Sequence, residues 1–307
     1  MSSYKFIKNK ILILDGAVPY KYKNIDLSKI YKKQNGLYRF FRKINYHTSI
    51  LGRSYWYDNW KDEIEKYDII IIFDGVMGNE IIDFIKSRNK KCRIILYYIN
   101  KISINSRNNP KNFIKKDCEI WSFDKSDCEL YQLRYNHYYY EYSSKKLKKT
   151  PIKNDVFFVG VDKGRLRELV NIKKILMEKG FVCDFVILKD KRKKYSLEDE
   201  KHLQEIYLDY NEVINRIAQS KTILDFVVEG QKGITLRPME AIFHSKKLIT
   251  NNKDILNYNF YDSNNIFILG YDPIDKIEKF LTENKFKDIP REIIDEYLFE
   301  SWLDRFL

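Results

Sequence analysis

Uninterrupted apolar runs alternate with amphipathic segments along most of the chain. The clearest runs are residues 10–14 (KILIL) and 68–73 (DIIIIF), which predict strands buried on both faces of a parallel sheet. Residues 80–88 carry apolar side chains at the spacing of one helix face. Two more apolar runs, 93–99 and 119–123, follow that segment. This alternation predicts a doubly wound α/β domain in the N-terminal half.

The same alternation begins again after residue 154. We expect, in chain order, strand 155–159, helix 165–179, strand 182–188, strand 205–207, helix 211–220, strand 222–228, a helix beginning near Thr235, strand 247–250, strand 266–269 and helix 274–283. Between the halves, residues 138–154 hold tyrosines, serines and a basic run, which is typical of a linker. We therefore predict two Rossmann-like domains, residues 1–150 (linker included) and 151–290, followed by an amphipathic terminal segment, 291–307. A further helix is expected from Trp56 to Lys66.

The composition supports two cores and an anionic partner. A chain of 307 residues is long enough for two domains, and 44% hydrophobic residues exclude a disordered chain. The formal net charge of +13 is compatible with a nucleotide, a nucleic acid, an anionic membrane surface or a phosphorylated lipid. No apolar run approaches the roughly 20 residues that span a bilayer, and the N-terminus is polar. We expect a soluble or peripheral protein without a signal peptide.

Cysteine and histidine spacing gives no metal site. The four cysteines lack C-x-x-C spacing, so we expect reduced thiols in a cytoplasmic protein; they are Cys92, Cys118, Cys128 and Cys183. The four histidines are scattered along the chain and form no triad by spacing. No D-x-D motif is present, and Asp124 and Asp127 are expected to begin a helix instead. We therefore expect no metal and no other cofactor.

The stretch 221–252 predicts an anion-binding site. Its strand, 222–228, is followed by Gly230 and Gly233, which permit a tight loop and a close approach of the backbone. Thr235 is then placed to cap the next helix. Free backbone N–H groups and the helix dipole favour an anion at such a helix start.

Two charged residues in this helix refine the prediction. Arg237 lies in the first turn, where a guanidinium binds phosphate through two hydrogen bonds. Glu240 follows on the same face and has the chemistry to bind sugar hydroxyls. The alternative is an Arg–Glu pair on the surface of an ordinary helix.

Residues 229–252, EGQKGITLRPMEAIFHSKKLITNN, resemble the donor-binding segment of bacterial GT-B glycosyltransferases of the lipopolysaccharide and capsule biosynthesis type. The matching positions are Gln231, Gly233, Ile234, Thr235, Arg237, Glu240 and residues 246–252. The resemblance implies two Rossmann-like domains facing across a cleft, with the terminal helix returning to the first. It also implies a nucleotide-diphosphate sugar in the C-terminal domain, with its ribose near Glu240. The implied activity is sugar transfer to a glycan or lipid-linked glycan acceptor, without a metal.

A second glycine loop opens the C-terminal half. Residues 157–165, FFVGVDKGR, end a strand and begin a helix, so the same physics predicts an anion site there. This loop resembles the F-x-G-x-D-K-G-R loop of the same glycosyltransferases, which implies donor contacts for Gly160, Lys163 and Arg165. The alternative is that Lys163 and Arg165 only decorate the surface.

Asp15 and Asp74 each follow a predicted strand of the N-terminal half. Ligands of open parallel sheets collect at the carboxyl ends of the strands, where a carboxylate can act as the general base for an acceptor hydroxyl. The alternative is that each aspartate caps the turn after its strand. We favour Asp74, because it ends the clearest strand.

Basic and aromatic residues interleave between positions 29 and 53. Such a segment suits an anionic membrane surface or single-stranded nucleic acid, and equally a helix with its aromatic face packed inward. His47 lies in this segment and is a candidate for acceptor contact. Two rivals to the enzyme remain: a non-catalytic binding partner of a membrane glycan enzyme, and a nucleic-acid-binding protein suggested by charge alone. We expect no nucleic-acid partner.

Overall fold

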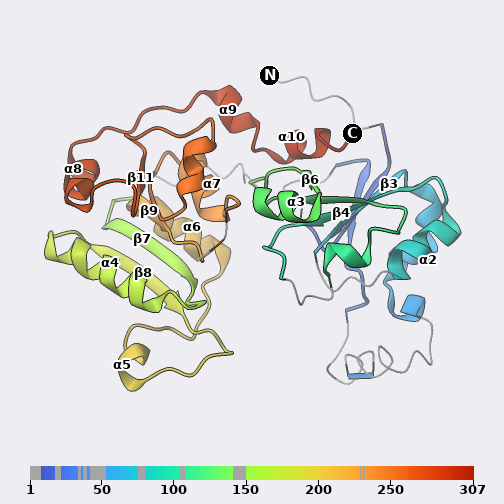
Figure 1. Ribbon diagram of the computed structural model, residues 1–307, viewed down its shortest axis with the longest axis horizontal. Coiled ribbons are helices and arrows are strands. Elements are labelled where there is room, and N and C mark those ends of the chain that lie inside the picture. The colour runs from blue at the N-terminus through green and yellow to red at the C-terminus, as the bar shows by residue number, and fades with distance from the viewer. Residues whose placement is uncertain are drawn as a thin grey trace. The chain divides into compact units, whose positions relative to one another are not determined.

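The computed structural model describes residues 8–17, 22–33, 36, 40–41, 53–74, 80–103, 108–140, 150–228, 230 and 232–307. The chain divides into two compact units, Met1–His137 and Tyr138–Leu307. Each unit is built on a parallel sheet with helices beside it (Figure 1).

In the N-terminal unit the described residues form a sheet of six parallel strands in the order β2-β1-β3-β4-β5-β6. Its elements are β1 (Ile11–Leu14), β2 (Ile25–Ser28), β3 (Ile69–Phe73), α2 (Glu80–Arg88), β4 (Arg93–Tyr98), β5 (Glu119–Ser122), α3 (Lys125–Tyr131) and β6 (Arg134–Tyr135). Every residue of β1 and β3 is buried, as their unbroken apolar runs predict. Helix α2 buries Ile81, Ile82 and Ile85 in the same core as Leu12 and Ile70.

The C-terminal unit contains a five-stranded parallel sheet, counted over the described residues, in the order β11-β10-β9-β7-β8. Its strands are β7 (Asn154–Val161), β8 (Cys183–Leu188), β9 (Ser220–Asp225), β10 (Lys247–Thr250) and β11 (Ile266–Ile268). Its helices are α4 (Leu166–Glu178), α5 (Leu197–Glu200), α6 (Tyr210–Ala218), α7 (Leu236–Phe243), α8 (Ile277–Thr282), α9 (Arg291–Asp295) and α10 (Phe299–Asp304).

Helices cover both faces of this second sheet. On β9, Ile223 packs in a core with α6 and α7, while its neighbour Leu224 packs in a core with α4 and α8. Alternate side chains of a strand point to opposite faces, so these two contacts place α6 and α7 on the face opposite α4 and α8 (Figure 1). Both faces of the sheet are therefore buried.

The strand order defines a switch point in each unit. In the C-terminal sheet the chain passes from β7 to β8 on one side and then returns to β9 on the other side of β7. The N-terminal sheet repeats this order, with its reversal between β1 and β3. The loops that leave the two strands of such a reversal diverge and leave a crevice at the carboxyl ends, where open α/β sheets bind ligands.

The predicted fold class, α/β with two Rossmann-like doubly wound domains, is confirmed. Some elements were predicted wrongly. The expected helix from Trp56 to Lys66 is a series of short 3₁₀ turns, one of them capped by the Asp58 carboxylate. The expected strand 205–207 is absent from this described region, because Ile206 is 81% exposed and Tyr207 is 55% exposed, so neither contributes to a sheet core.

The terminal segment also differs from a single helix, since α9 and α10 are separate. In α10, Phe299 and Trp302 pack on Tyr139 with ring centroids 5.2 Å and 4.7 Å apart, which ties the end of the chain to the first residues of its own unit. The return of this segment to the N-terminal unit stays a prediction. No helix in the described ranges combines the length and the apolar character that a bilayer crossing requires.

Candidate nucleotide site at the β7–β9 switch point

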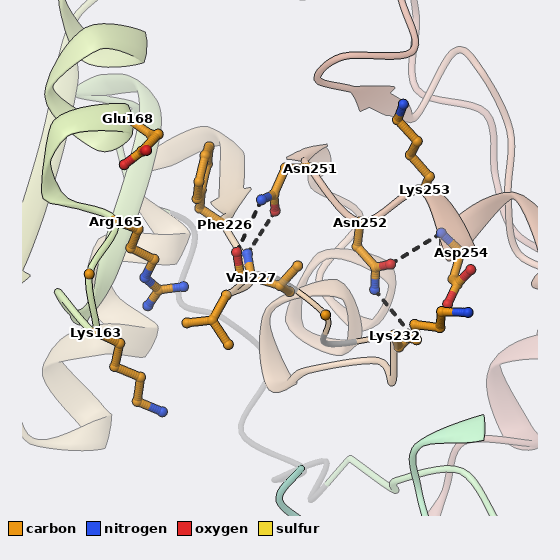
Figure 2. Close-up of a pocket in the computed structure, with 13 residues that line it drawn as sticks. Lys163, Arg165, Glu168, Phe226, Val227, Lys232, Asn251, Asn252, Lys253 and Asp254 are labelled. Atoms are coloured by element: carbon orange, nitrogen blue, oxygen red, sulfur yellow. Dashed lines mark hydrogen bonds between the residues drawn. The ribbon is translucent and has the colours of Figure 1, made fainter. Parts of the chain in front are cut away.

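A cavity of about 660 Å³ lies at the carboxyl ends of β7, β9 and β10 (Figure 2). Its four basic lining residues are Lys163, Arg165, Lys232 and Lys253. Its acidic lining residues are Glu168 and Asp254, and its amides are Asn251 and Asn252. Phe226, Val227 and Val228 supply an apolar wall. An apolar surface beside several cations suits a ligand with a ring at one end and anionic groups at the other.

The loop from β7 to α4 forms the first basic wall. Lys163 and Gly164 have φ angles of 47° and 96°, so two consecutive residues are left-handed and the chain reverses sharply. The buried Asp162 carboxylate holds this reversal, because it accepts hydrogen bonds from Leu166 N (2.7 Å) and Tyr195 Oη (2.9 Å). Burial acts to raise the pKa of Asp162, but these donors outweigh it and the pKa is lowered. Asp162 therefore stays ionised and fixes the loop.

Arg165 lies in this wall, and not all of its guanidinium N–H groups have a hydrogen-bond partner among the described residues. Its Nη2 donates to the Val161 carbonyl at 3.0 Å, and the guanidinium lies 5.5 Å from the Phe158 ring centroid. Arg165 Nε is buried without a hydrogen-bond partner among the described residues, while other atoms of the residue line the cavity. A side chain at Gly160 would bring its Cβ within 2.9 Å of Arg165 Nη2. Gly160 thus makes room for the arginine and does not itself line the cavity.

The loop after β9 forms the opposite wall. Asn251 pairs with the main chain of Val227, accepting from Val227 N at 2.7 Å and donating to Val227 O at 3.0 Å. Asn252 donates through Nδ2 to the Lys232 carbonyl at 3.3 Å. Figure 2 shows these two amides linking the β9 loop to the end of β10. The predicted contact of Gln231 falls outside the described residues.

Helix α7 begins as expected but does not line the cavity. Thr235 is its N-cap and accepts a hydrogen bond from Arg237 N at 3.3 Å. Arg237 forms an ion pair with Glu240, whose side chain is completely buried. Burial raises the pKa of Glu240 to about 7, although the positive charge of Arg237 opposes this. Gly233, Thr235, Arg237 and Glu240 do not line the cavity, so the donor contacts predicted for these four residues stay predictions.

Asp15 and Asp74 end the two strands at the reversal of the N-terminal sheet. The half-buried Asp74 carboxylate accepts hydrogen bonds at 3.0 Å from both the main-chain N and the Nδ2 of Asn100. Burial raises the pKa of Asp74 in spite of these donors. Asp15 has a φ of 57° and lies 3.7 Å from the Lys29 ammonium. Either position suits a ligand-facing carboxylate; the base assignment stays a prediction.

Of the remaining residues considered in the sequence, Asp124 and His244 have structural roles, and His47 lies outside the described residues. Asp124 caps α3, as expected, and His244 is bonded to Tyr140 Oη at 2.9 Å. Burial lowers the pKa of His244 to about 4, so its imidazole is neutral, and it packs edge-on against the Tyr140 ring. His47 and most of the basic aromatic segment 29–53 lie outside the described residues. Sequence reasoning overlooked Asp225, since a single carboxylate at the end of an apolar run gives no motif.

No family model and no curated protein sequence matches this chain. Among solved structures, the chain is similar to sucrose-phosphate synthase from Thermosynechococcus elongatus, with a TM-score of 0.50, 8% identity and 96% of each chain covered. It is also similar to a glycosyltransferase from Rickettsia africae ESF-5, with a TM-score of 0.49, 10% identity and coverage of 92% of this chain and 83% of that chain. At such low identity the first likeness shows the fold: this chain shares the two-domain α/β architecture of the synthase over nearly its whole length.

Proposed function

We propose that the protein is a glycosyltransferase that takes its sugar from a nucleotide-diphosphate donor bound in the C-terminal cavity. The observation that carries the proposal is the convergence of the Lys163–Arg165 loop and the Lys232 loop on one cavity at the switch point. The two loops carry the motifs of residues 157–165 and 229–252 that resemble the donor loops of glycosyltransferases. The fold likeness to sucrose-phosphate synthase supports the same reading.

The cavity has the chemistry that a departing nucleoside diphosphate needs. When the bond between the anomeric carbon and the phosphate oxygen breaks, negative charge grows on the diphosphate. Lys163 and Arg165 lie at the start of α4 and offer positive charge and N–H donors to that oxygen. Lys232 and Lys253 add two cations from the other wall. A cavity of about 660 Å³ is within the usual range for small-molecule sites.

Asp74 is our choice for the general base in this proposal. Its carboxylate would accept the proton of the acceptor hydroxyl as that oxygen bonds to the anomeric carbon. Its raised pKa supports the choice, because a carboxylate with a higher proton affinity is the stronger base. The Asn100 amide orients the carboxylate through its hydrogen bonds.

The acceptor in this proposal is a bacterial surface glycan: lipopolysaccharide, lipooligosaccharide or capsule. This assignment rests on the likeness of residues 157–165 and 229–252 to the donor loops of enzymes of that type. A lipid-linked glycan at the inner membrane face would fit the net charge of +13, since an anionic surface attracts a basic protein. Metal independence belongs to the same proposal.

A thermal-shift screen with UDP-, GDP-, CMP- and dTDP-sugars tests the donor. A ligand at a hundredfold excess over its Kd stabilises the native state by about 2.7 kcal/mol, which corresponds to a Tm increase of about 5–10 °C. The stabilising sugar nucleotide should then be hydrolysed slowly, with release of its nucleotide, in the presence of EDTA. If no sugar nucleotide shifts Tm but oligonucleotides bind with strong salt dependence, the protein is a nucleic-acid binder instead.

A further inference from the structure

Asp225 ends β9, the central strand between β7 and β10, and the next residue, Phe226, lines the candidate nucleotide site. Its side chain is 3% exposed, and both of its oxygens accept hydrogen bonds from threonine hydroxyls. Neither Lys nor Arg forms an ion pair with it among the described residues. A carboxylate buried at this cost requires a compensating role.

The first hydroxyl connects Asp225 to the start of α7. Thr235 Oγ1 donates to Asp225 Oδ1 at 2.8 Å and accepts from Arg237 N at 3.3 Å. Because the hydroxyl proton points to the carboxylate, the oxygen lone pairs face the helix N–H. The carboxylate thereby sets the orientation of the N-cap and the place where Arg237 enters the helix.

The second hydroxyl repeats this arrangement on the neighbouring strand. Thr250 Oγ1 donates to Asp225 Oδ2 at 3.0 Å and accepts from Asn252 N at 3.1 Å. Asn252 then donates to the Lys232 carbonyl at 3.3 Å, which links the turn after β10 to the loop that carries a basic residue of the cavity. One carboxylate therefore reaches the Asn252 and Lys232 wall of the cavity through Thr250, and the start of α7 through Thr235.

The charge of Asp225 also acts on the arginines. Burial raises the pKa of Asp225 above its ordinary value, and the two hydroxyls and the positive charges of Arg165 and Arg237 offset only part of this increase. In return, the negative charge of Asp225 favours the charged form of Arg165, which burial disfavours. An asparagine would keep the size of the side chain, but it would lose this charge and could accept from only one hydroxyl.

We propose that Asp225 is the positioning residue of the donor site: through the Thr235 and Thr250 hydroxyls it fixes the start of α7 and the Asn252 turn, which bonds to the Lys232 loop of the cavity. This inference rests on the proposed function, since it concerns the same cavity. Asp225 does not line the cavity and would act only through these neighbours.

The test replaces each hydroxyl by a methyl group. Thr235→Val and Thr250→Val keep the side-chain shape and remove one relay each. Thr222→Val is the matched control, because Thr222 is buried in β9, the strand of Asp225, and its hydroxyl has no hydrogen-bond partner among the described residues. The probes are UDP, GDP, CDP and dTDP, each compared with its nucleoside, titrated well below every variant's Tm.

We expect each relay variant to weaken binding of the preferred nucleoside diphosphate by about three- to tenfold, the usual effect of one lost hydrogen bond. Binding of the nucleoside and the behaviour of Thr222→Val should stay unchanged. In the Asp225→Asn background, adding Thr235→Val should cost less than it does in the wild type, because both changes break the same relay.

The outcomes separate the inference from the function on which it rests. If the wild type binds a nucleoside diphosphate and the relay variants bind it equally well, the positioning role is wrong and the donor site stands. Equal losses for nucleoside and diphosphate would show a general structural role and would also overturn the inference. If the wild type binds none of the four diphosphates, the proposed function is wrong and the inference falls with it.

Discussion

Replacing Arg165 with methionine removes one cation from the cavity and leaves most of the packing in place. The side chain contributes one hydrogen bond to the Val161 carbonyl and a contact with the Phe158 ring, each worth about 1 kcal/mol. Its burial as a cation opposes these gains, since burial lowers the pKa of Arg165. The net change in the free energy of unfolding should stay within about 1 kcal/mol, or about 2–4 °C in Tm.

The expected loss in donor affinity is larger. A guanidinium about 4 Å from a phosphate charge interacts by about 4 kcal/mol at an effective dielectric constant near 20. Part of that energy is spent on desolvation, so a charge-assisted hydrogen bond contributes about 1.5–3 kcal/mol. Arg165→Met should therefore weaken binding of the preferred nucleoside diphosphate by about 10- to 150-fold.

Isothermal titration of the nucleoside diphosphate measures this effect. Arg167→Met is the matched control, because Arg167 lies on the same helix, is exposed and does not line the cavity. The control should bind like the wild type. Equal affinity of Arg165→Met and Arg167→Met would refute the assignment of the diphosphate to this wall, since both variants lose the same net charge.

Three further predictions follow from the same structure. Gly164→Ala should cost about 1–2 kcal/mol of stability and weaken diphosphate binding, because φ is 96° and the new Cβ would lie 3.0 Å from Lys193 Nζ. Gly180→Ala is the control: its φ is 83° and no atom lies within 4 Å of the new Cβ, so it should cost the same amount of stability without changing the affinity. As pH rises from 4.5 to about 7, the free energy of unfolding of Glu240→Gln should increase by about 3 kcal/mol relative to that of the wild type, as measured by chemical denaturation. The reason is that the pKa of Glu240 is raised in the folded state, so the folded wild type keeps a proton that the unfolded chain releases, and it loses stability as pH rises through that window. A difference that does not change with pH would contradict this prediction. In the wild type, kcat/KM should decrease at acid pH with an apparent pKa higher than the ordinary 3.8 of an aspartate. Asp74→Asn should abolish this acid limb of the pH profile, and a limb that persists in the variant would exclude Asp74 as the base.

The sequence predicts this fold well because its strands are buried on both faces. Residues 69–73 are all apolar, and only a strand covered on both sides of a parallel sheet requires that composition. The end of such a strand is equally visible, so Asp15 and Asp74 were placed correctly at the carboxyl edge. The short strand predicted at 205–207 was wrong, because one apolar and one aromatic residue after Glu205 carry too little pattern to separate a strand from an exposed loop.

Local chemistry was predictable, whereas relations between distant segments were not. The capping role of Thr235 follows from its place before an amphipathic helix, and the structure confirms it. The bonds that join Asp225 to Thr250, or Asn252 to Lys232, depend on the order of β9 and β10 in the sheet. No spacing in the sequence encodes that order, so the hydrogen bonds of Asp225 could not be predicted from the sequence.

The burial of Glu240 illustrates the same limit. Its spacing from Arg237 predicts contact between the two side chains, and they do form an ion pair. Whether that helix face meets solvent or the core depends on the helices packed beside α7.

In the proposed function, the cavity between the β7–α4 and β9–α7 loops holds the diphosphate of a nucleotide. A crystal structure of the protein with the nucleoside diphosphate that gives the largest thermal shift tests it directly. We predict phosphate density in contact with Lys163 and Arg165, with Asn252 and Lys232 on the opposite wall of the same cavity. Phosphates bound elsewhere, with this cavity filled only by water, would contradict the account.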